Sequence, residues 1–243
     1  AEPEHELRMG PNIKDWPEQP ALSDDLLVKV VSYITDPVTT TDELIPSGET
    51  SSYRSNPLRL AEFALSRKDP AYVGRAKAVH AVETARERGE ALPEDVQAVY
   101  AALTRAGVAS NPAGTVIGST IYANKPGDGS AREQAASCQR VLGACANIAM
   151  EYATKRYRSN CINWGILPFT IDQGTPFDYQ PGDCVFVPGI RAAIENGAED
   201  IPAQVICRDG STHDLLLHVR GLTQDEKEII LDGCLMNYYA ARM

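Results

Sequence analysis

The sequence predicts an α/β protein with a mixed sheet or barrel and a helical insertion. Three observations lead to this prediction. Short runs of β-branched and apolar residues recur along the chain, and helical patterns separate the earlier ones. The last third of the chain has the pattern of β-hairpins, with a turn at Asp209-Gly210. Strands joined partly by crossover helices and partly by hairpins are typical of a mixed sheet.

Composition limits the possible classes of protein. The chain has 243 residues, of which 43% are hydrophobic and 23% charged, so it can bury a sizeable core as one domain or two. No apolar run approaches about 18 residues, and we expect no segment to span a membrane. The net charge of −10 argues against nucleic acid or an anionic membrane as the main partner. A local arginine pocket could still bind an anionic small molecule.

The cysteines and the N-terminus indicate the compartment. The six cysteines are dispersed, with neither a CxxC pair nor a paired Cys/His spacing. We therefore expect reduced thiols and no metal bound by this chain alone. The acidic N-terminus lacks the basic and apolar regions of a signal peptide, so we expect a cytoplasmic protein. The missing initiator methionine indicates a processed chain or an excised piece of a longer one, and we favour the second.

The N-terminal lead-in is expected to be irregular. Residues 1–24 are polar and contain four prolines, so the folded domain is expected over 25–243. Within that domain, the pattern of residues 71–105, broken at Gly89, predicts two helices packed on the main fold. We treat about 67–105 as an insertion whose charges form a solvated face.

The remaining elements follow in chain order from their periodicity and their capping residues. The expected strands cover residues 26–31, 116–117, 166–169, 184–188, 203–207 and 214–219. The expected helices cover residues 57–65, 134–149, 152–163 and 227–239. Thr223 and Glu226 have the spacing of a capping box that opens the last of them. Cys138 and Cys145 fall seven residues apart in the second of these helices, which would place them on one buried face.

A glycine-rich loop before the helix expected at 134–149 is the main candidate site. It contains Gly129-Ser130-Ala131-Arg132-Glu133. A helix N-terminus offers unpaired N–H groups and a dipole that favours negative charge, so a hydroxyl and a guanidinium there can hold and act on a small anion. The spacing from Ser130 to Glu133 is also typical of a capping box, in which Ser130 is only the N-cap.

Two further signatures flank this loop. The first is Thr40-Thr41-Asp42-Glu43-Leu44-Ile45-Pro46-Ser47-Gly48, with Arg54 six residues after the glycine. Loops rich in hydroxyls and Asx residues often bond to their own backbone, so Thr41 and Asp42 are interpreted as a supporting loop that aims Arg54. The second signature comprises Asn160, Gly165-Ile166-Leu167-Pro168-Phe169, Asp183 and Gly233-Cys234-Leu235-Met236-Asn237.

In this order, the signatures resemble the C-terminal swivel domain of the aconitase superfamily, which also occurs as the small subunit of isopropylmalate isomerases. The resemblance covers roughly residues 11–58 and 114–243. It implies a mobile, swivelling β/β/α domain that closes over an active site. It also implies a 4Fe-4S cluster held by cluster-bearing domains or a large subunit, and not by this chain. The insertion has no counterpart in the resemblance and indicates a divergent branch of hydratases.

The resemblance also implies roles for single residues. Ser130 takes the position of the catalytic serine, which removes the α-proton of a hydroxy-carboxylate, and Gly129 and Glu133 belong to its supporting loop. Arg132 and Arg54 take positions that bind substrate carboxylates. The implied enzyme is an iron–sulfur hydro-lyase of hydroxy di- or tricarboxylates, a hydratase or dehydratase, and this chain would be inactive without the cluster-bearing domains.

Some residues depart from the family pattern. Ala131 stands where a second serine is usual, Gln134 where histidine is common, and Lys155 where aconitases proper have arginine. These departures leave the substrate open. They also leave a second interpretation, in which the chain is a non-catalytic module of the same fold that binds a carboxylate metabolite or plays a regulatory part. RNA binding by such a module is disfavoured by the acidic charge.

Overall fold

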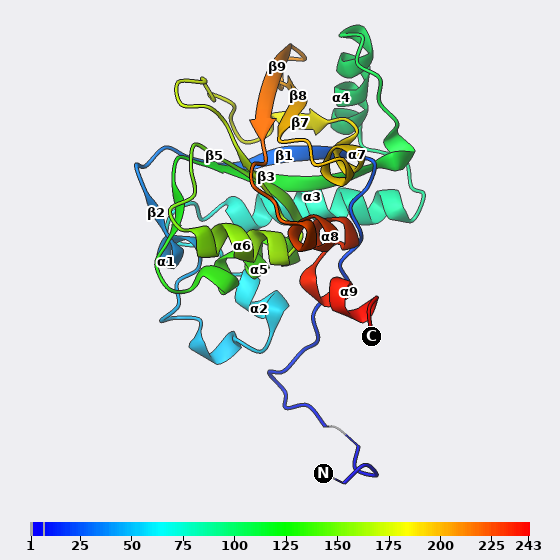
Figure 1. Ribbon diagram of the computed structural model, residues 1–243. Coiled ribbons are helices and arrows are strands. Elements are labelled where there is room, and N and C mark those ends of the chain that lie inside the picture. The colour runs from blue at the N-terminus through cyan, green and yellow to red at the C-terminus, as the bar shows by residue number, and fades with distance from the viewer. Residues whose placement is uncertain (1, 7) are drawn as a thin grey trace.

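A closed sheet forms the centre of the computed structural model, which describes residues 2–6 and 8–243. The order of its strands is β1-β3-β5-β6-β9-β8-β7, and β7 returns to β1 (Figure 1). Neighbouring strands are parallel from β1 to β6 and antiparallel over the rest of the circuit. The predicted α/β class with a mixed sheet or barrel is confirmed. The strands are β1 (Asp25–Ile34), β3 (Thr115–Ala123), β5 (Ala144–Ala149), β6 (Leu167–Thr170), β7 (Cys184–Val187), β8 (Asp200–Ile206) and β9 (Thr212–His218).

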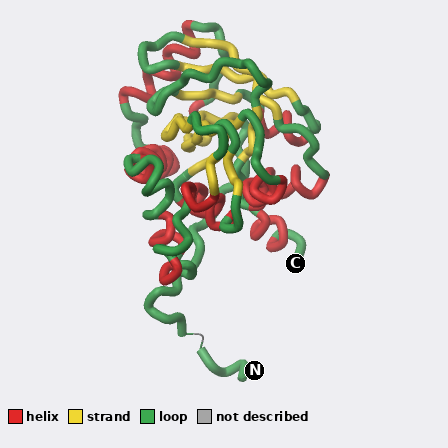
Figure 2. The backbone as a smooth tube through the Cα atoms, turned by 90° about the vertical axis from the view of Figure 1, so that its left-hand side faces the viewer, coloured by secondary structure: helices red, strands yellow, loops and turns green. Residues whose placement is uncertain are grey.

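The helices follow from the connections that each half of the sheet requires. Parallel strands need crossovers, so α5 joins β3 to β5 and α6 joins β5 to β6, whereas β8 and β9 form a hairpin. Figure 1 shows that α3, α5, α6 and α8 lie on the same side of the strands, and in the turned view of Figure 2 most helices again lie below the strands. The longer helices are α3 (Tyr72–Glu87), α4 (Glu94–Arg105), α5 (Arg132–Val141), α6 (Lys155–Asn163) and α8 (Gln224–Asp232). The shorter elements are β2 (Thr39–Thr40), α1 (Thr41–Leu44), η1 (Ser51–Tyr53), α2 (Pro57–Ala61), η2 (Pro112–Gly114), β4 (Pro126–Asp128), α7 (Ile190–Glu195) and α9 (Leu235–Ala240).

The alternation of side chains along β1 divides the apolar core in two. Leu26, Val28 and Val30 belong to the cluster shared with β5 to β9, inside the closed sheet. Leu27 and Val31 belong to a second cluster, which the strands share with α2 to α5. Since successive side chains of a strand point to opposite faces, one strand serves both cores.

The circuit of the sheet is closed unevenly. Strands β1 and β7 pair at four positions, from Leu26–Val187 to Lys29–Cys184, whereas β6 and β9 pair only at Thr170–His218. His218 is buried at this seam, with Nδ1 2.7 Å from an oxygen of Asp200. The exposed His213 lies five residues away on the opposite face of β9, as the odd spacing predicts.

The two predicted helices of the insertion are present as α3 and α4, but the prediction that their charges are solvated is wrong for Glu83. Its side chain is 8% exposed and accepts the backbone N–H of Ile117 at 2.9 Å. The carboxylate also pairs with Arg86, through Nη2 at 2.7 Å. Ile117 pairs with Leu27 of β1 on one edge, but it precedes the residues that pair with β5, so Glu83 satisfies an N–H on the edge of β3 that β5 does not reach.

Two of the predicted helices end earlier than expected, in each case at a glycine with positive φ. The helix expected at 134–149 ends at Val141, and Ala144–Ala149 is the buried strand β5. Gly143 has φ +90° and stops the helix, and its neighbours β3 and β6 then override the helical preference of alanine. Cys138 and Cys145 therefore lie on different elements, contrary to the prediction.

The helix expected at 227–239 is likewise interrupted, between α8 and α9. Gly233 ends α8 with φ +95°, and a Cβ there would lie 2.1 Å from the carbonyl oxygen of Pro20. Close approach of the lead-in backbone therefore requires glycine at this position. The capping box predicted at Thr223 and Glu226 is confirmed at the start of α8.

Candidate active site

The loop that precedes α5 is held by Thr41 of α1. Thr41 Oγ1 accepts the backbone N–H of Ala131 at 3.3 Å, and the threonine is 3% exposed. Gly129 has φ +132°, and a Cβ there would lie 2.2 Å from Thr41 Oγ1, so only glycine fits. Thr40 caps α1 in a reciprocal capping box with Glu43, as the hydroxyl-rich loop predicts. Two signatures that are distant in the sequence thus meet in space.

The predicted capping role of Ser130 is wrong. Helix α5 begins at Arg132, its N-cap is Ala131, and no side chain caps it. Ser130 lies one residue earlier and is exposed. Glu133 is also not part of a capping box, because its Oε1 accepts the indole N–H of Trp164 at 3.0 Å. The backbone N–H of Ala131 bonds to Thr41 instead, so the loop is fixed by tertiary contacts and not by a local cap.

The opposite wall is built by the segment between α1 and α2. Asp42 accepts the backbone N–H of Ser47 at 3.1 Å, and its second oxygen accepts Arg67 Nη1 at 2.9 Å. Arg67 also bonds Glu49 through Nη2 at 2.7 Å. These contacts fix the turn that carries Ser47. Asp42 therefore shapes the loop, and Arg54 follows immediately after η1.

The two walls enclose an open pocket of about 330 Å³. Its lining consists of Ser47, Arg54, Ser130, Ala131, Glu133 and Gln134. The pocket thus combines two hydroxyls, a guanidinium, a carboxylate and an amide. Within the described part of the chain, Arg54 makes no ion pair and no side-chain hydrogen bond, so its charge is available to an anion.

The structure brings together Ser130, Arg54 and Glu133, with Thr41, Asp42 and Gly129 as supports, but it does not bring Arg132 into the pocket lining. Arg132 is half-buried, and its Nε is buried without a partner among residues 2–6 and 8–243. Sequence reasoning missed Ser47 as a lining residue, and it treated Gln134 only as a departure from the family. It also missed Trp164, since its contact with Glu133 spans 31 residues and leaves no local pattern.

The cysteines do not form a metal site. Within the described ranges, no group of three or more His, Cys, Asp or Glu side chains is arranged to hold a metal ion. Burial raises the pKa of Cys161 and Cys184 to about 12, which disfavours the thiolate that metals bind. The donor set of the described residues therefore does not fit an iron–sulfur cluster. No helix in the described part is both long and apolar enough to cross a membrane.

Comparison with known proteins bears on the class of domain. Residues 113–174, which include Ser130 and the loop before α5, match the family described as the aconitase C-terminal domain. Over 120 residues, or 48% of the chain, the sequence is 28% identical to aconitate hydratase A of Bradyrhizobium diazoefficiens. The chain spans only 13% of that relative's length.

The fold of this chain resembles a solved structure over most of the length of both chains. It is 3-isopropylmalate dehydratase from Methanocaldococcus jannaschii, with a TM-score of 0.50 and 21% sequence identity. The match covers 90% of this chain and 95% of the other. At this identity the likeness concerns the fold. Fold and sequence matches together define the class as an α/β domain with a closed mixed sheet. More particularly, residues 113–174 are similar to the aconitase C-terminal domain, and the fold is similar to that of the 3-isopropylmalate dehydratase structure.

Proposed function

We propose that this chain is the swivel domain of a hydro-lyase, a hydratase or dehydratase that acts on a hydroxy di- or tricarboxylate. One observation carries the proposal: Ser130 and an unpaired Arg54, brought from distant parts of the sequence, line the same pocket. The family matches support it, since residues 113–174 contain the serine. Arg54 would bind a substrate carboxylate and place the substrate's α-carbon toward Ser130.

In the proposed reaction, Ser130 acts as the base in its alkoxide form. The alkoxide takes the proton from the carbon next to a substrate carboxylate and becomes the hydroxyl, the electron pair of the broken C–H bond forms the carbon–carbon double bond, and the hydroxyl leaves the neighbouring carbon as hydroxide. A serine oxygen can do this only where positive charge stabilises its anion. Arg54 and the N-terminal end of α5, which begins two residues after Ser130, supply such charge. Arg132, in the first turn of α5, is proposed as a second carboxylate ligand on the resemblance alone, since it does not line the pocket.

The remaining parts of the reaction are assigned to other domains. We propose that a cluster-bearing domain or large subunit would hold a 4Fe-4S cluster, which would supply Lewis-acid chemistry for the departing hydroxyl. This chain would then be inactive alone, and the domain would close over the cluster-bearing partner. A cytoplasmic location is part of the same proposal.

The test uses the parent protein, or this chain mixed with its cluster-bearing partner, reconstituted anaerobically with iron and sulfide. It is offered a panel of 2- and 3-hydroxy di- and tricarboxylates, and the conjugated enoate is followed in the ultraviolet. We expect Ser130→Ala to lower turnover by at least about a thousandfold, because the base is lost. The matched control is Ser52→Ala, since Ser52 is an exposed serine of η1 that does not line the pocket. Turnover that survives Ser130→Ala would refute the role of the serine.

A second candidate function is favoured by the methyl group of Ala131, which lines the pocket where the family usually has a hydroxyl. A domain that has lost this hydroxyl could bind a carboxylate without converting it. Carboxylate binding that is abolished by Arg54→Gln, with no turnover of any acid by the reconstituted parent, would identify such a module.

A further inference from the structure

Both tryptophans of the chain lie together beside the candidate pocket. Trp16 of the lead-in and Trp164 at the end of α6 have ring centroids 4.4 Å apart, and Trp164 is 9% exposed. The indole N–H of Trp164 donates to Oε1 of Glu133 at 3.0 Å. Trp16 donates no side-chain hydrogen bond within the described ranges. Of the two indoles, Trp164 is the one that donates a hydrogen bond to a pocket residue, Glu133.

The position of Glu133 matters because of the other charge in the pocket. Glu133 and Arg54 both line it, yet they do not form an ion pair. A carboxylate in an open pocket beside a free guanidinium would be expected to swing toward it and pair. Such a pair would neutralise the cation and compete with any bound anion. The bond from Trp164 holds Glu133 in its place on the helix side of the pocket.

We propose that Trp164 is a positioning residue that restrains Glu133 and thereby keeps Arg54 free to bind a substrate carboxylate. Trp16 supports this arrangement by packing against the indole, with the two ring planes tilted by 46°. The lead-in is itself fixed along α5, because Arg140 near the end of that helix donates to Gln19 Oε1 at 2.7 Å and to the carbonyl of Pro20 at 3.4 Å. The segment before β1 thus contacts the end of α5 directly, and it reaches the first turn of α5 only through Trp164.

The inference rests on the proposed function in one respect, since it takes the pocket to bind a carboxylate. The test therefore measures binding by this chain, with malate as the probe and calorimetry as the readout. Trp164→Phe keeps a large ring but removes the N–H donor. We expect it to weaken malate binding by about three- to tenfold, because Glu133 is released to pair with Arg54.

Two further variants separate positioning from a general loss of structure. Trp16→Phe makes the same chemical change without removing a bond to Glu133. We expect its malate affinity to lie within about twofold of that of the unmodified chain. Adding Glu133→Gln to Trp164→Phe removes the competing charge, and we expect it to restore most of the lost affinity. A merely structural role of Trp164 would not be rescued in this way. Thermal melting of each variant checks that the fold is retained.

The outcomes distinguish this inference from the proposed function. Weakening by Trp164→Phe that Glu133→Gln reverses supports the positioning role. If Arg54→Gln weakens malate binding while Trp164→Phe leaves it unchanged, or if the double variant is no better than Trp164→Phe, the positioning role is refuted and the carboxylate pocket stands. If neither Arg54→Gln nor Trp164→Phe changes malate binding, or the unmodified chain binds no malate, the positioning role is refuted together with the carboxylate pocket on which it rests, whereas the proposed hydro-lyase is judged by its own turnover test.

Discussion

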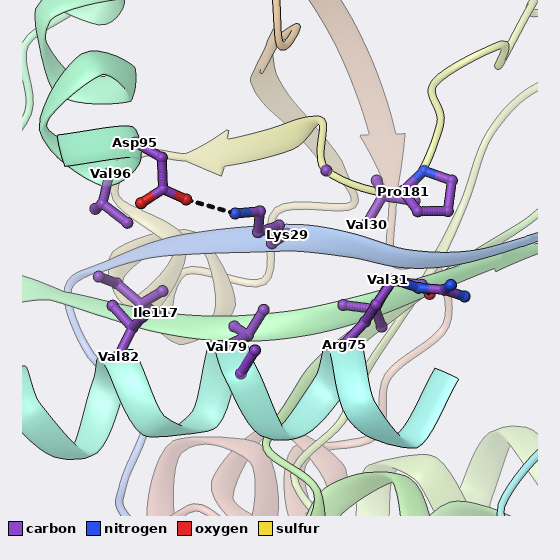
Figure 3. A pocket seen from close by; sticks show the side chains of 12 residues that line it. Lys29, Val30, Val31, Arg75, Val79, Val82, Asp95, Val96, Ile117 and Pro181 are labelled. Atoms are coloured by element: carbon purple, nitrogen blue, oxygen red, sulfur yellow. Dashed lines mark hydrogen bonds and ion pairs between the residues drawn. The ribbon is translucent and has the colours of Figure 1, made fainter. Parts of the chain in front are cut away.

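Two of the hollows on this fold differ in the polarity of the side chains that line them. The hollow under the insertion, about 250 Å³, is walled by valines and an isoleucine, and its Lys29 pairs with Asp95 at 2.7 Å (Figure 3). The pocket of Ser130, about 330 Å³, is polar, and its Arg54 has no ion-pair partner among the described residues. The volume of a hollow therefore does not by itself identify a ligand-binding site. Charges satisfied within the fold hold structure together, whereas an unsatisfied charge is available to a ligand.

The largest effect should come from the buried anchor of the insertion, and it should concern stability alone. Glu83→Ala leaves the N–H of Ile117 and the guanidinium of Arg86 without their partner. We expect a loss of about 3 kcal/mol in the free energy of unfolding, measured in urea, with malate binding at the other pocket retained. Glu83→Gln, which keeps an acceptor, is the matched control and should cost less. Equal losses in both variants would contradict the hydrogen-bond argument.

The reverse pattern is expected at Arg54. Arg54→Gln removes the free charge of the polar pocket, and we expect malate affinity measured by calorimetry to fall by about ten- to a hundredfold. The unfolding free energy should change by less than about 0.5 kcal/mol, because the exposed guanidinium makes no bond in the described part of the fold. Arg59→Gln, at an exposed arginine outside the pocket lining, should leave affinity unchanged. A stability loss without a binding loss would remove Arg54 from the site.

The smallest effect is expected at the paired charge under the insertion. The hydrogen bond from Lys29 lowers the pKa of Asp95 below its ordinary value, despite partial burial. A lowered carboxyl pKa stabilises the fold above the unfolded value of about 4, and that stability is lost as the pH falls through the lowered pKa. Lys29→Met should therefore cost less than about 1 kcal/mol at neutral pH, and urea unfolding should show the difference from the parent vanishing in acid. A difference that persists in acid would indicate lost packing.

The mixed architecture was predictable because its periodic runs and turns are local. The predicted helices of the insertion, the hairpin turn at Asp209-Gly210 and the capping box at Thr223 are all present. Strand β5 was mistaken for helix because its alanines carry high helix propensity, and burial between two parallel strands decides against it. Gly143, with its positive φ, was the local signal that could have corrected this.

The candidate site was predictable in part. Ser130 and Arg54 follow from a resemblance that relies on order and spacing, and the pocket contains both. The surroundings of Ser130 were not predictable, because contacts with residues distant in sequence set them. Thr41 Oγ1 accepts the N–H of Ala131, which lies 90 residues away in the sequence. Glu133 accepts the indole N–H of Trp164 and does not form the predicted capping box. A sequence pattern reports neighbours within about one helical turn, and such contacts lie outside its range.

The uneven closure of the sheet affects how the domain responds to temperature. With one backbone pairing between β6 and β9, against four between β1 and β7, cohesion at that seam depends more on side chains, which provide apolar packing inside the barrel and an ion pair of Arg220 Nη2 with Asp172 Oδ1 at 3.6 Å. Hydrophobic cohesion weakens on cooling, whereas a ladder of hydrogen bonds has no such entropic origin. We therefore expect low temperature to loosen the seam beside Thr170 and His218 before it loosens the pairing of β1 with β7.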